Sequence, residues 1–409
     1  MAPLTTDDAS TSDGRAAGSP GSADRTAELV ALAEELLTRR HGATVRLADP
    51  VDLGGSTRSL VVRVRVAENP FSLPHTLVVK HYLDEPAAGS ADRFRYEAAS
   101  CQLLTAMPSE ERASPMLVAH DPTHRMLVLE DLGRCATLAD RLDERDPKAA
   151  ERALLGWARA LGRMQASTAG REDDFGALLR RFGERTWRDP LADDARAALA
   201  EVPDQLAQLL RVEAAPSAVV EARGAARLLG GSGHRAFSPA EIRPDNCLVT
   251  GSGSRFLDFE WACFRDIALT GASLRLPLPS GGPARAQPSG MAEAMVAAWQ
   301  AELTPVWPDL GDADLLRERL LHAEVLWVWL ATRALLPAVV GGPASRPPHV
   351  VVADPGEDAP AVLSALWRRL GVDAERAGRV ATAELAASVV GALGRHGGDV
   401  PLPPYPAFA

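Results

Sequence analysis

Lysine is nearly absent from this sequence, although basic residues are not. Of the 44 lysines and arginines in 409 residues, only Lys80 and Lys148 are lysines. The acidic residues number 54, so the formal net charge is −10. An acidic chain disfavours general binding to nucleic acid, whose phosphates attract basic surfaces, and it suits a cationic ligand. We therefore expect no nucleic-acid partner.

Cysteine and long apolar runs are also scarce. The four cysteines show no CxxC spacing, which argues against a cysteine-based metal site and for free thiols in a reducing compartment. No run of about 18 apolar residues occurs, so we expect no membrane span. The first 25 residues have neither a basic start nor an apolar core, unlike a signal peptide. We expect a soluble, cytoplasmic protein; its oligomeric state is left open.

The composition is that of a globular protein, with 46% hydrophobic and 24% charged residues. The length favours two domains. Residues 1–24 contain almost no large apolar side chains, so we expect a disordered tail there. Residues 25–132 predict a sheet lobe, and residues 133–409 predict a mainly helical lobe that carries the catalytic loop.

The sheet lobe is predicted from alternating and helical apolar patterns. Its expected elements are a helix over 27–42, strands over 43–51, 59–68 and 75–83, a helix over 91–107, and strands over 115–121 and 126–133. This order predicts a mostly antiparallel sheet with one inserted helix. In the second lobe, residues 147–167 and 313–336 have the clearest amphipathic helical spacing, and residues 340–360 form a Pro/Gly-rich excursion.

Lys80 ends the apolar strand "LVVK". A compact ammonium on a flexible stem can bind phosphate oxygens as a point charge, although a lysine at a strand end can also simply reach solvent. Glu97, in the next helix, could form the ion pair that holds Lys80 toward nucleotide phosphates. A solvated helix carboxylate is the alternative for Glu97.

Two further segments could contact a nucleotide. Gly54, Gly55 and Ser56 lie in "DLGGSTRS", where glycines would let backbone amides approach a phosphate; a double glycine in a hairpin is also an ordinary turn. The segment Leu129, Glu130 and Asp131 follows an apolar strand in "MLVLEDLG". It could link the two lobes and offer backbone groups to an adenine edge.

The sharpest pattern is "FSPAEIRPDNCLV" followed by "FLDFEWA". Asn246 and Asp258 would supply the hard oxygen ligands that Mg²⁺ prefers. Glu241 could accept the proton of an attacking hydroxyl, and Arg243 could neutralise charge on a transferred phosphoryl group. The structural alternative is a turn built on "RPDN".

Taken in chain order, these features resemble the aminoglycoside phosphotransferase family within the protein-kinase-like fold. The resemblance covers roughly residues 45–275, and "LVLEDLG", "RPDNCLV" and "FLDFEWACFRD" are the most similar segments. It implies an α+β, bilobal protein-kinase-like fold with ATP and Mg²⁺ as cofactors. It also implies transfer of the γ-phosphate to a hydroxyl of a small molecule, such as an aminoglycoside-like compound, an amino alcohol or a sugar.

The resemblance assigns roles residue by residue. Lys80 would hold the α- and β-phosphates with Glu97 as its partner, Asn246 and Asp258 would bind Mg²⁺, and the backbone of residues 129–131 would line the adenine pocket. Substrate contacts are expected from residues 140–146 and from the segment after residue 266.

The sequence departs from the family around the base. Pro239, Ala240 and Glu241 stand where the family commonly has His-Gly-Asp; Arg243 replaces a usual His, and Thr270 replaces an expected acidic residue. Glutamate adds one methylene to the reach of aspartate, and misplacement by about 1 Å can cost on the order of a hundredfold in rate. Phosphoryl transfer depends mainly on positioning and charge stabilisation.

Three hypotheses follow. The first is a phosphotransferase that is slow or has a repositioned base. The second is a catalytically impaired pseudokinase that binds nucleotide or a protein partner. The third, an unrelated α+β protein, would require several separate matches to fall in this order by chance.

Overall fold

The computed structural model describes residues 20–56, 58–68, 73–83, 92–184, 187–239, 242–278, 283–342 and 358–409. Its contacts divide the chain into two compact units. Unit 1 comprises residues 1–83 and 119–129, and unit 2 comprises residues 84–118 and 130–409. Residues 1–19 of the predicted tail lie outside the described residues, whereas residues 20–24 belong to the first helix, α1.

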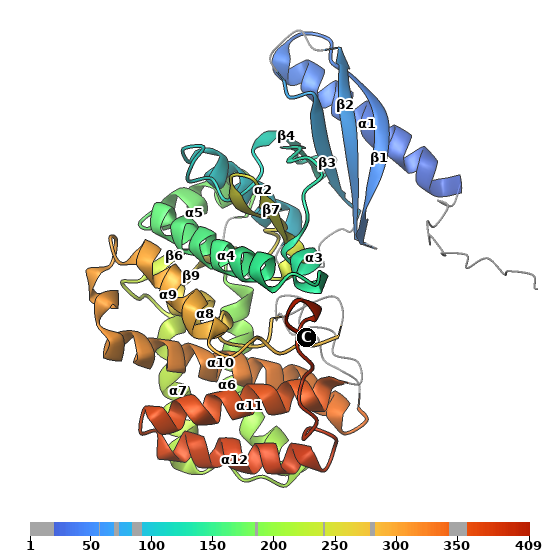
Figure 1. The fold of residues 1–409 in the computed structure, drawn as a ribbon. Coiled ribbons are helices and arrows are strands. Elements are labelled where there is room, and N and C mark those ends of the chain that lie inside the picture. The colour runs from blue at the N-terminus through green and yellow to red at the C-terminus, as the bar shows by residue number, and fades with distance from the viewer. Residues whose placement is uncertain are drawn as a thin grey trace, which may run out of the picture. The chain divides into compact units, whose positions relative to one another are not determined.

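The described residues of unit 1 form one helix and a five-stranded sheet in the order β1-β2-β3-β5-β4; Figure 1 shows the helix α1 beside β1, β2 and β3. β1 pairs antiparallel with β2, and β2 with β3. The ends of β4 and β5 extend into unit 2. The elements are α1 (Pro20–His41), β1 (Arg46–Ser56), β2 (Ser59–Glu68), β3 (Thr76–Tyr82), β4 (Leu117–Asp121) and β5 (Met126–Glu130).

The apolar patterns of unit 1 account for its two layers. In β2, Val62 and Val64 are fully buried and alternate with more exposed residues, as expected for a strand with one covered face. In α1, Leu29, Ala33 and Leu37 recur at four-residue spacing and are buried. Because such spacing places side chains on one helical stripe, α1 packs this stripe against β1 and β3.

Unit 2 is mainly helical. Its helices are α2 (Arg93–Thr105), α3 (Leu138–Asp143), α4 (Pro147–Thr168), α5 (Glu172–Arg181), α6 (Pro190–Gln205), α7 (Pro216–Gly224), α8 (Ile267–Ser273), α9 (Met291–Leu303), α10 (Ala313–Val339), α11 (Ala359–Arg376) and α12 (Val380–Gly394). Short helical turns are η1 (Leu206–Leu210), η2 (Ala225–Leu229), η3 (Pro244–Asn246), η4 (Pro308–Gly311) and η6 (Pro406–Phe408). Its strands are β6 (Arg235–Ser238), β7 (Cys247–Thr250), β8 (Gly253–Phe256) and β9 (Cys263–Asp266).

Tryptophans form the large side chains of the core of unit 2. A Cβ atom on Gly162 of α4 would lie 2.7 Å from the carbonyl oxygen of Trp299 in α9, so glycine allows these two helices to pack closely. The long helix α10 contacts α6, α8 and α11. The Trp367 indole donates a hydrogen bond to the Thr332 hydroxyl at 2.9 Å, which satisfies the polar atoms of two fully buried side chains.

The α+β class predicted from the sequence is confirmed, because an antiparallel sheet precedes a mainly helical remainder. The contacts within the chain place the inserted helix α2 in unit 2, whereas the sequence predicted it in a lobe over residues 25–132. The predicted division into domains stays a prediction. Most of the Pro/Gly-rich excursion, residues 343–357, lies outside the described residues. Within the described part of the chain, no helix has both the length and the apolar character to cross a membrane.

Candidate functional site

Asn246 and Asp258 flank the open end of one hairpin. Asn246 ends the turn η3 immediately before β7, and Asp258 lies two residues after β8. β7 and β8 pair antiparallel, and the amide of Leu257 donates to the carbonyl oxygen of Asn246 at 2.8 Å. The two predicted metal ligands are therefore neighbours in unit 2, although they are twelve positions apart in the sequence.

Asp258 has a left-handed backbone with φ of 65°. This conformation is uncommon for residues other than glycine and costs on the order of 1–3 kcal/mol, and such positions gather at functional sites. Asp258 and Asn246 are both half-buried. Their carboxylate and amide oxygens match the ligands that Mg²⁺ takes, so this donor set fits the predicted metal.

Arg243 makes a contact that the sequence did not predict. Its guanidinium forms a two-pronged ion pair with Asp245, which includes a 2.9 Å hydrogen bond from Nε to Oδ1. Such paired bonds fix the plane of the guanidinium. Asp245 therefore already neutralises part of the positive charge of Arg243. The predicted contact of Arg243 with a phosphoryl group would have to form beside this ion pair. Residues 240 and 241 lie outside the described residues, so the role of Glu241 stays a prediction.

Lys80 and the glycine turn lie at the same end of the sheet in unit 1. Lys80 on β3 pairs with Val61 on β2. Gly55 on β1 pairs with Leu60, the residue that precedes Val61 on β2. Lys80 is 9% exposed, and its Nζ lies 5.1 Å from the centre of the Tyr82 ring, within range for a cation–π contact. The sheet thus brings the lysine and the glycine turn together.

The glycine turn has a specific need for Gly55. Its φ is 147°, and a Cβ there would lie 2.2 Å from the carbonyl oxygen of Ser59. Gly54 also has a positive φ, and its amide donates to Asp52 Oδ1 at 2.8 Å. Both glycines lie within β1 at a register shift, where the sequence predicted a loop between strands. The Ser56 side chain lies outside the part of the chain that the structure describes, so its predicted contact with a phosphate stays a prediction.

Glu97 lies on α2 in unit 2 and is 2% exposed. Burying a carboxylate is costly unless it gains hydrogen-bond or charge partners, so a solvated surface carboxylate, the alternative considered from the sequence, is excluded. Lys80 belongs to unit 1. The predicted ion pair between them stays a prediction.

The segment predicted to face adenine begins where unit 1 ends. Leu129 belongs to unit 1, and Glu130 and Asp131 belong to unit 2. The Glu130 amide donates to the Met116 carbonyl oxygen at 2.9 Å. This amide is therefore used within the fold, and a contact to an adenine edge would have to use other backbone groups of this segment.

Carboxylates predicted to touch a substrate have structural partners. Asp140 forms a reciprocal capping box with Thr137 at the start of α3. Asp146 caps α4 through the amide of Ala149. These bonds satisfy amides at the helix N-termini, so both carboxylates contribute to the fold.

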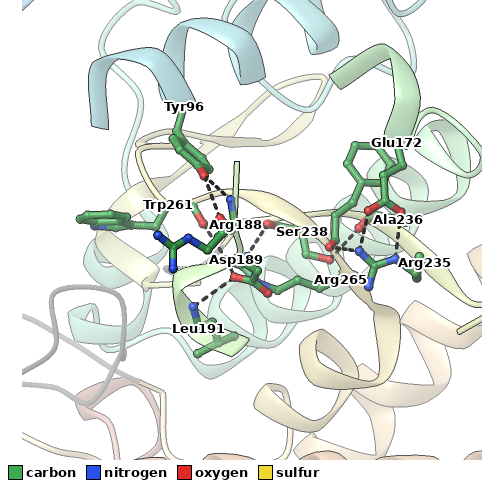
Figure 2. A network of polar contacts seen from close by, with 11 residues as sticks. Tyr96, Glu172, Arg188, Asp189, Leu191, Arg235, Ala236, Ser238, Trp261 and Arg265 are labelled. Atoms are coloured by element: carbon green, nitrogen blue, oxygen red, sulfur yellow. Dashed lines mark hydrogen bonds and ion pairs between the residues drawn. The ribbon is translucent and has the colours of Figure 1, made fainter. Parts of the chain in front are cut away.

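A buried polar network in unit 2 was not predicted from the sequence (Figure 2). Arg265 on β9 is 2% exposed, and its guanidinium binds Asp189 through contacts of 2.7–3.0 Å. It also donates to the carbonyl oxygens of Ser238 at 3.0 Å and Trp261 at 2.8 Å. Burial alone would lower the pKa of Arg265, but the Asp189 carboxylate outweighs this effect and the pKa lies above its usual value.

Tyr96 of α2 extends the network. Its hydroxyl donates to the carbonyl oxygen of Arg188 at 2.7 Å (Figure 2), and this bond holds the backbone beside Asp189. Burial raises the pKa of Tyr96, so the hydroxyl remains a donor. Asp189 and Arg265 are 76 positions apart, and no motif spacing links them; Arg265 lies in the "FLDFEWACFRD" segment, but no role was predicted for it from the sequence.

No protein-family model matches this chain, and no curated protein matches it. Solved structures similar to it include a choline kinase from Cryptosporidium parvum Iowa II, with 9% identity over 88% of this chain and 99% of the other and a TM-score of 0.49. A thermostable mutant of an aminoglycoside phosphotransferase has 13% identity over 90% of this chain and 100% of the other, with a TM-score of 0.41.

A choline kinase from Streptococcus pneumoniae is similarly related, with 13% identity over 87% of this chain and 99% of the other and a TM-score of 0.40. The solved structures that this chain is similar to thus include two choline kinases and an aminoglycoside phosphotransferase.

Proposed function

We propose that this chain is a phosphotransferase that uses ATP and Mg²⁺ and passes the γ-phosphoryl group to a hydroxyl of a small molecule. The observation that carries the proposal is the pairing of Asn246 with Leu257, which sets the Asn246 and Asp258 side chains at one hairpin end. The left-handed backbone of Asp258 is compatible with a functional position, since residues in such conformations gather at functional sites, although aspartate tolerates this region better than most residues.

Asn246 and Asp258 would hold the metal ion through their side-chain oxygens. Bound Mg²⁺ would neutralise part of the charge on the transferred phosphoryl oxygens. The hydrogen bond from the Leu257 amide to the Asn246 carbonyl oxygen would keep the two metal ligands close together, because Leu257 immediately precedes Asp258.

Lys80 would bind phosphate oxygens of the nucleotide, and the amides around Gly54 and Gly55 would approach them. Support comes from the register of unit 1, which aligns the lysine with the glycine turn. The Lys80 residue is buried, and charges attract more strongly in buried surroundings than in water. Lys80 is one of only two lysines among the 44 basic residues of the chain. Its compact ammonium can bind a phosphate oxygen as a point charge, unlike the broad guanidinium of arginine.

Glu241 would accept the proton of the acceptor hydroxyl as the bond to phosphorus forms. Because the loose transition state of phosphoryl transfer asks little of the base, a longer carboxylate lowers the rate more readily than it abolishes it. The net charge of −10 suits an acceptor that carries an amine, such as an aminoglycoside-like compound or an amino alcohol, with a sugar as the uncharged option.

Substitution at residue 241 tests this function. Purified protein is incubated with γ-labelled ATP, Mg²⁺ and a panel of amino alcohols, aminoglycosides and sugars, and label in the acceptor is measured. We expect Glu241→Gln to lower turnover by roughly 10²- to 10⁴-fold, the usual worth of a general base. Glu241→Asp is expected to retain or raise turnover.

The pseudokinase hypothesis is favoured by one specific observation. Pro239 has no amide hydrogen and no polar side chain, so it cannot brace the catalytic segment as a histidine could. If ATP binds but no acceptor in the panel is labelled by the wild type or by Glu241→Asp, the chain is a nucleotide-binding pseudokinase.

A further inference from the structure

Arg265 joins two segments that the proposed function needs in register. Ser238, which accepts its 3.0 Å bond, is the last residue of β6 and precedes the Pro239-Ala240-Glu241 segment. Trp261, which accepts its 2.8 Å bond, lies three residues after Asp258. One buried guanidinium therefore ties the strand that leads to the proposed base to the segment that leaves the proposed metal ligand.

Asp189 fixes this guanidinium from a third element. Its carboxylate accepts from Nε and Nη2 of Arg265 at 2.7–3.0 Å, and it also caps α6 through the amide of Leu191 at 3.1 Å. A buried charge is tolerated when it is paired and its remaining donors are bonded. The Arg265 fork meets both conditions, since every one of its nitrogens has a partner.

The Ser238 end is held from its other side as well. The Ser238 hydroxyl accepts from Gln165 Nε2 at 3.0 Å, and Gln165 Oε1 accepts from the Trp299 indole at 2.7 Å. All three side chains are buried. These hydrogen bonds hold Ser238 against α4 and α9. The carbonyl group that accepts from Arg265 is therefore fixed from both sides.

We propose that Arg265, held by Asp189, is a positioning residue for the phosphotransferase site. It sets Ser238, at the end of β6, relative to Trp261, three residues after Asp258. This inference rests on the proposed function, and it deepens it by naming the group that joins the strand before the proposed base to the segment after the proposed metal ligand. Arg265 touches neither substrate nor nucleotide in this role.

The chain offers a matched control at the other end of β6. Arg235 also binds a carboxylate in a forked arrangement, with Glu172 at 2.6 and 2.8 Å, and also donates to a β9 carbonyl, that of Phe264, at 2.7 Å (Figure 2). Arg235 is at the end of β6 away from Ser238. A loss of stability common to any such ion pair will appear in both variants, whereas loss of bracing will appear only with Arg265.

The test compares Arg265→Lys and Asp189→Asn with Arg235→Lys in the full chain. Lysine keeps the charge but cannot bond both carbonyls and the carboxylate as a fork does. We expect amide hydrogen exchange of residues 242–246 and 257–262 to become about tenfold faster in Arg265→Lys and Asp189→Asn, here called the clamp variants, and to stay unchanged in Arg235→Lys. With an acceptor in hand, kcat should fall by on the order of a hundredfold while the Kd for ATP is retained.

Equal exchange in these segments for the clamp variants and the control would overturn the proposal, as would a fall in ATP affinity with kcat unchanged. If Arg265→Lys does not fold, Asp189→Asn gives the same comparison with the guanidinium in place. If the wild type neither binds nor turns over ATP, the proposed function fails, whereas the exchange comparison still decides whether Arg265 braces these segments.

Discussion

The amide of Leu257 donates to the carbonyl oxygen of Asn246 at 2.8 Å, and this bond makes neighbours of the two proposed metal ligands. The next residue, Asp258, then turns into the left-handed region. Residues held in such conformations require support from the surrounding structure. The bond from Leu257 to Asn246 lies immediately before Asp258, and Arg265 donates to the carbonyl oxygen of Trp261 three residues after it.

The first prediction concerns the glycine turn of unit 1. Gly55→Ala should destabilise unit 1 by on the order of 1–3 kcal/mol, because a strained φ is joined by a clash of Cβ with Ser59. Gly54→Ala, which has positive φ but no atom within 4 Å of a Cβ, should cost less. Chemical denaturation of both variants measures the difference, and an equal loss would contradict the assigned role of Gly55.

The second prediction concerns a buried carboxylate in the helical part of unit 2. Burial raises the pKa of Glu324 to about 8; the Arg275 guanidinium, 2.8 Å away, opposes the shift and the Asp373 carboxylate adds to it. The folded state therefore binds a proton that the unfolded chain, with a usual pKa of 4.5, has released. Stability is then full below the unfolded pKa and is lost as the pH rises through the folded value.

Unfolding free energies measured from about pH 5 to 9 should accordingly fall with pH in this window. Glu324→Gln should flatten the fall, whereas Glu384→Gln, at an exposed position, should not. A wild-type curve that is flat, or one that Glu324→Gln leaves unchanged, would show that Glu324 is ionised in the folded protein.

The third prediction concerns thiol reactivity. Burial raises the pKa of Cys247 to about 12 and also raises that of Cys263, and Cys101 is buried as well. Alkylation requires an accessible thiolate. Iodoacetamide at about pH 8 should therefore modify native protein at Cys135 and react with all four thiols only after unfolding. Rapid labelling of native Cys247 would mean that the segment after Asn246 opens readily.

Sequence patterns were informative where local spacing decides the structure. The 313–336 pattern predicted α10 because its apolar spacing extends over several turns, and the alternation in residues 59–68 predicted β2. The glycine pair was predicted as a loop but lies inside β1, since a register shift lets a strand absorb extra residues. Local sequence does not reveal such a shift.

Long-range polar contacts could not be predicted. The roles of Arg265 and Asp189 arise from tertiary packing that brings β9 against the start of α6, and nothing in either segment signals the other. Asp140 and Asp146 were also not identified as helix caps from the sequence; the substrate contacts expected around residues 140–146 stay a prediction. Asn246 and Asp258 lie close together because the adjacent strands β7 and β8 form one short hairpin; their role as metal ligands stays a prediction.

Calorimetric titration of ATP into the purified protein, with Mg²⁺ and with EDTA, tests the proposed roles of Lys80 in unit 1 and of Asp258 in unit 2. Each variant has a matched control: Lys80→Ala is compared with Lys148→Ala, the other lysine of the chain, and Asp258→Asn with Asp204→Asn on the exposed side of α6. The proposed function predicts ATP binding that requires Mg²⁺ and is weakened by Lys80→Ala and Asp258→Asn but by neither control. Absence of ATP binding in the folded wild type, or binding that is indifferent to Mg²⁺ and to both site variants, would contradict it.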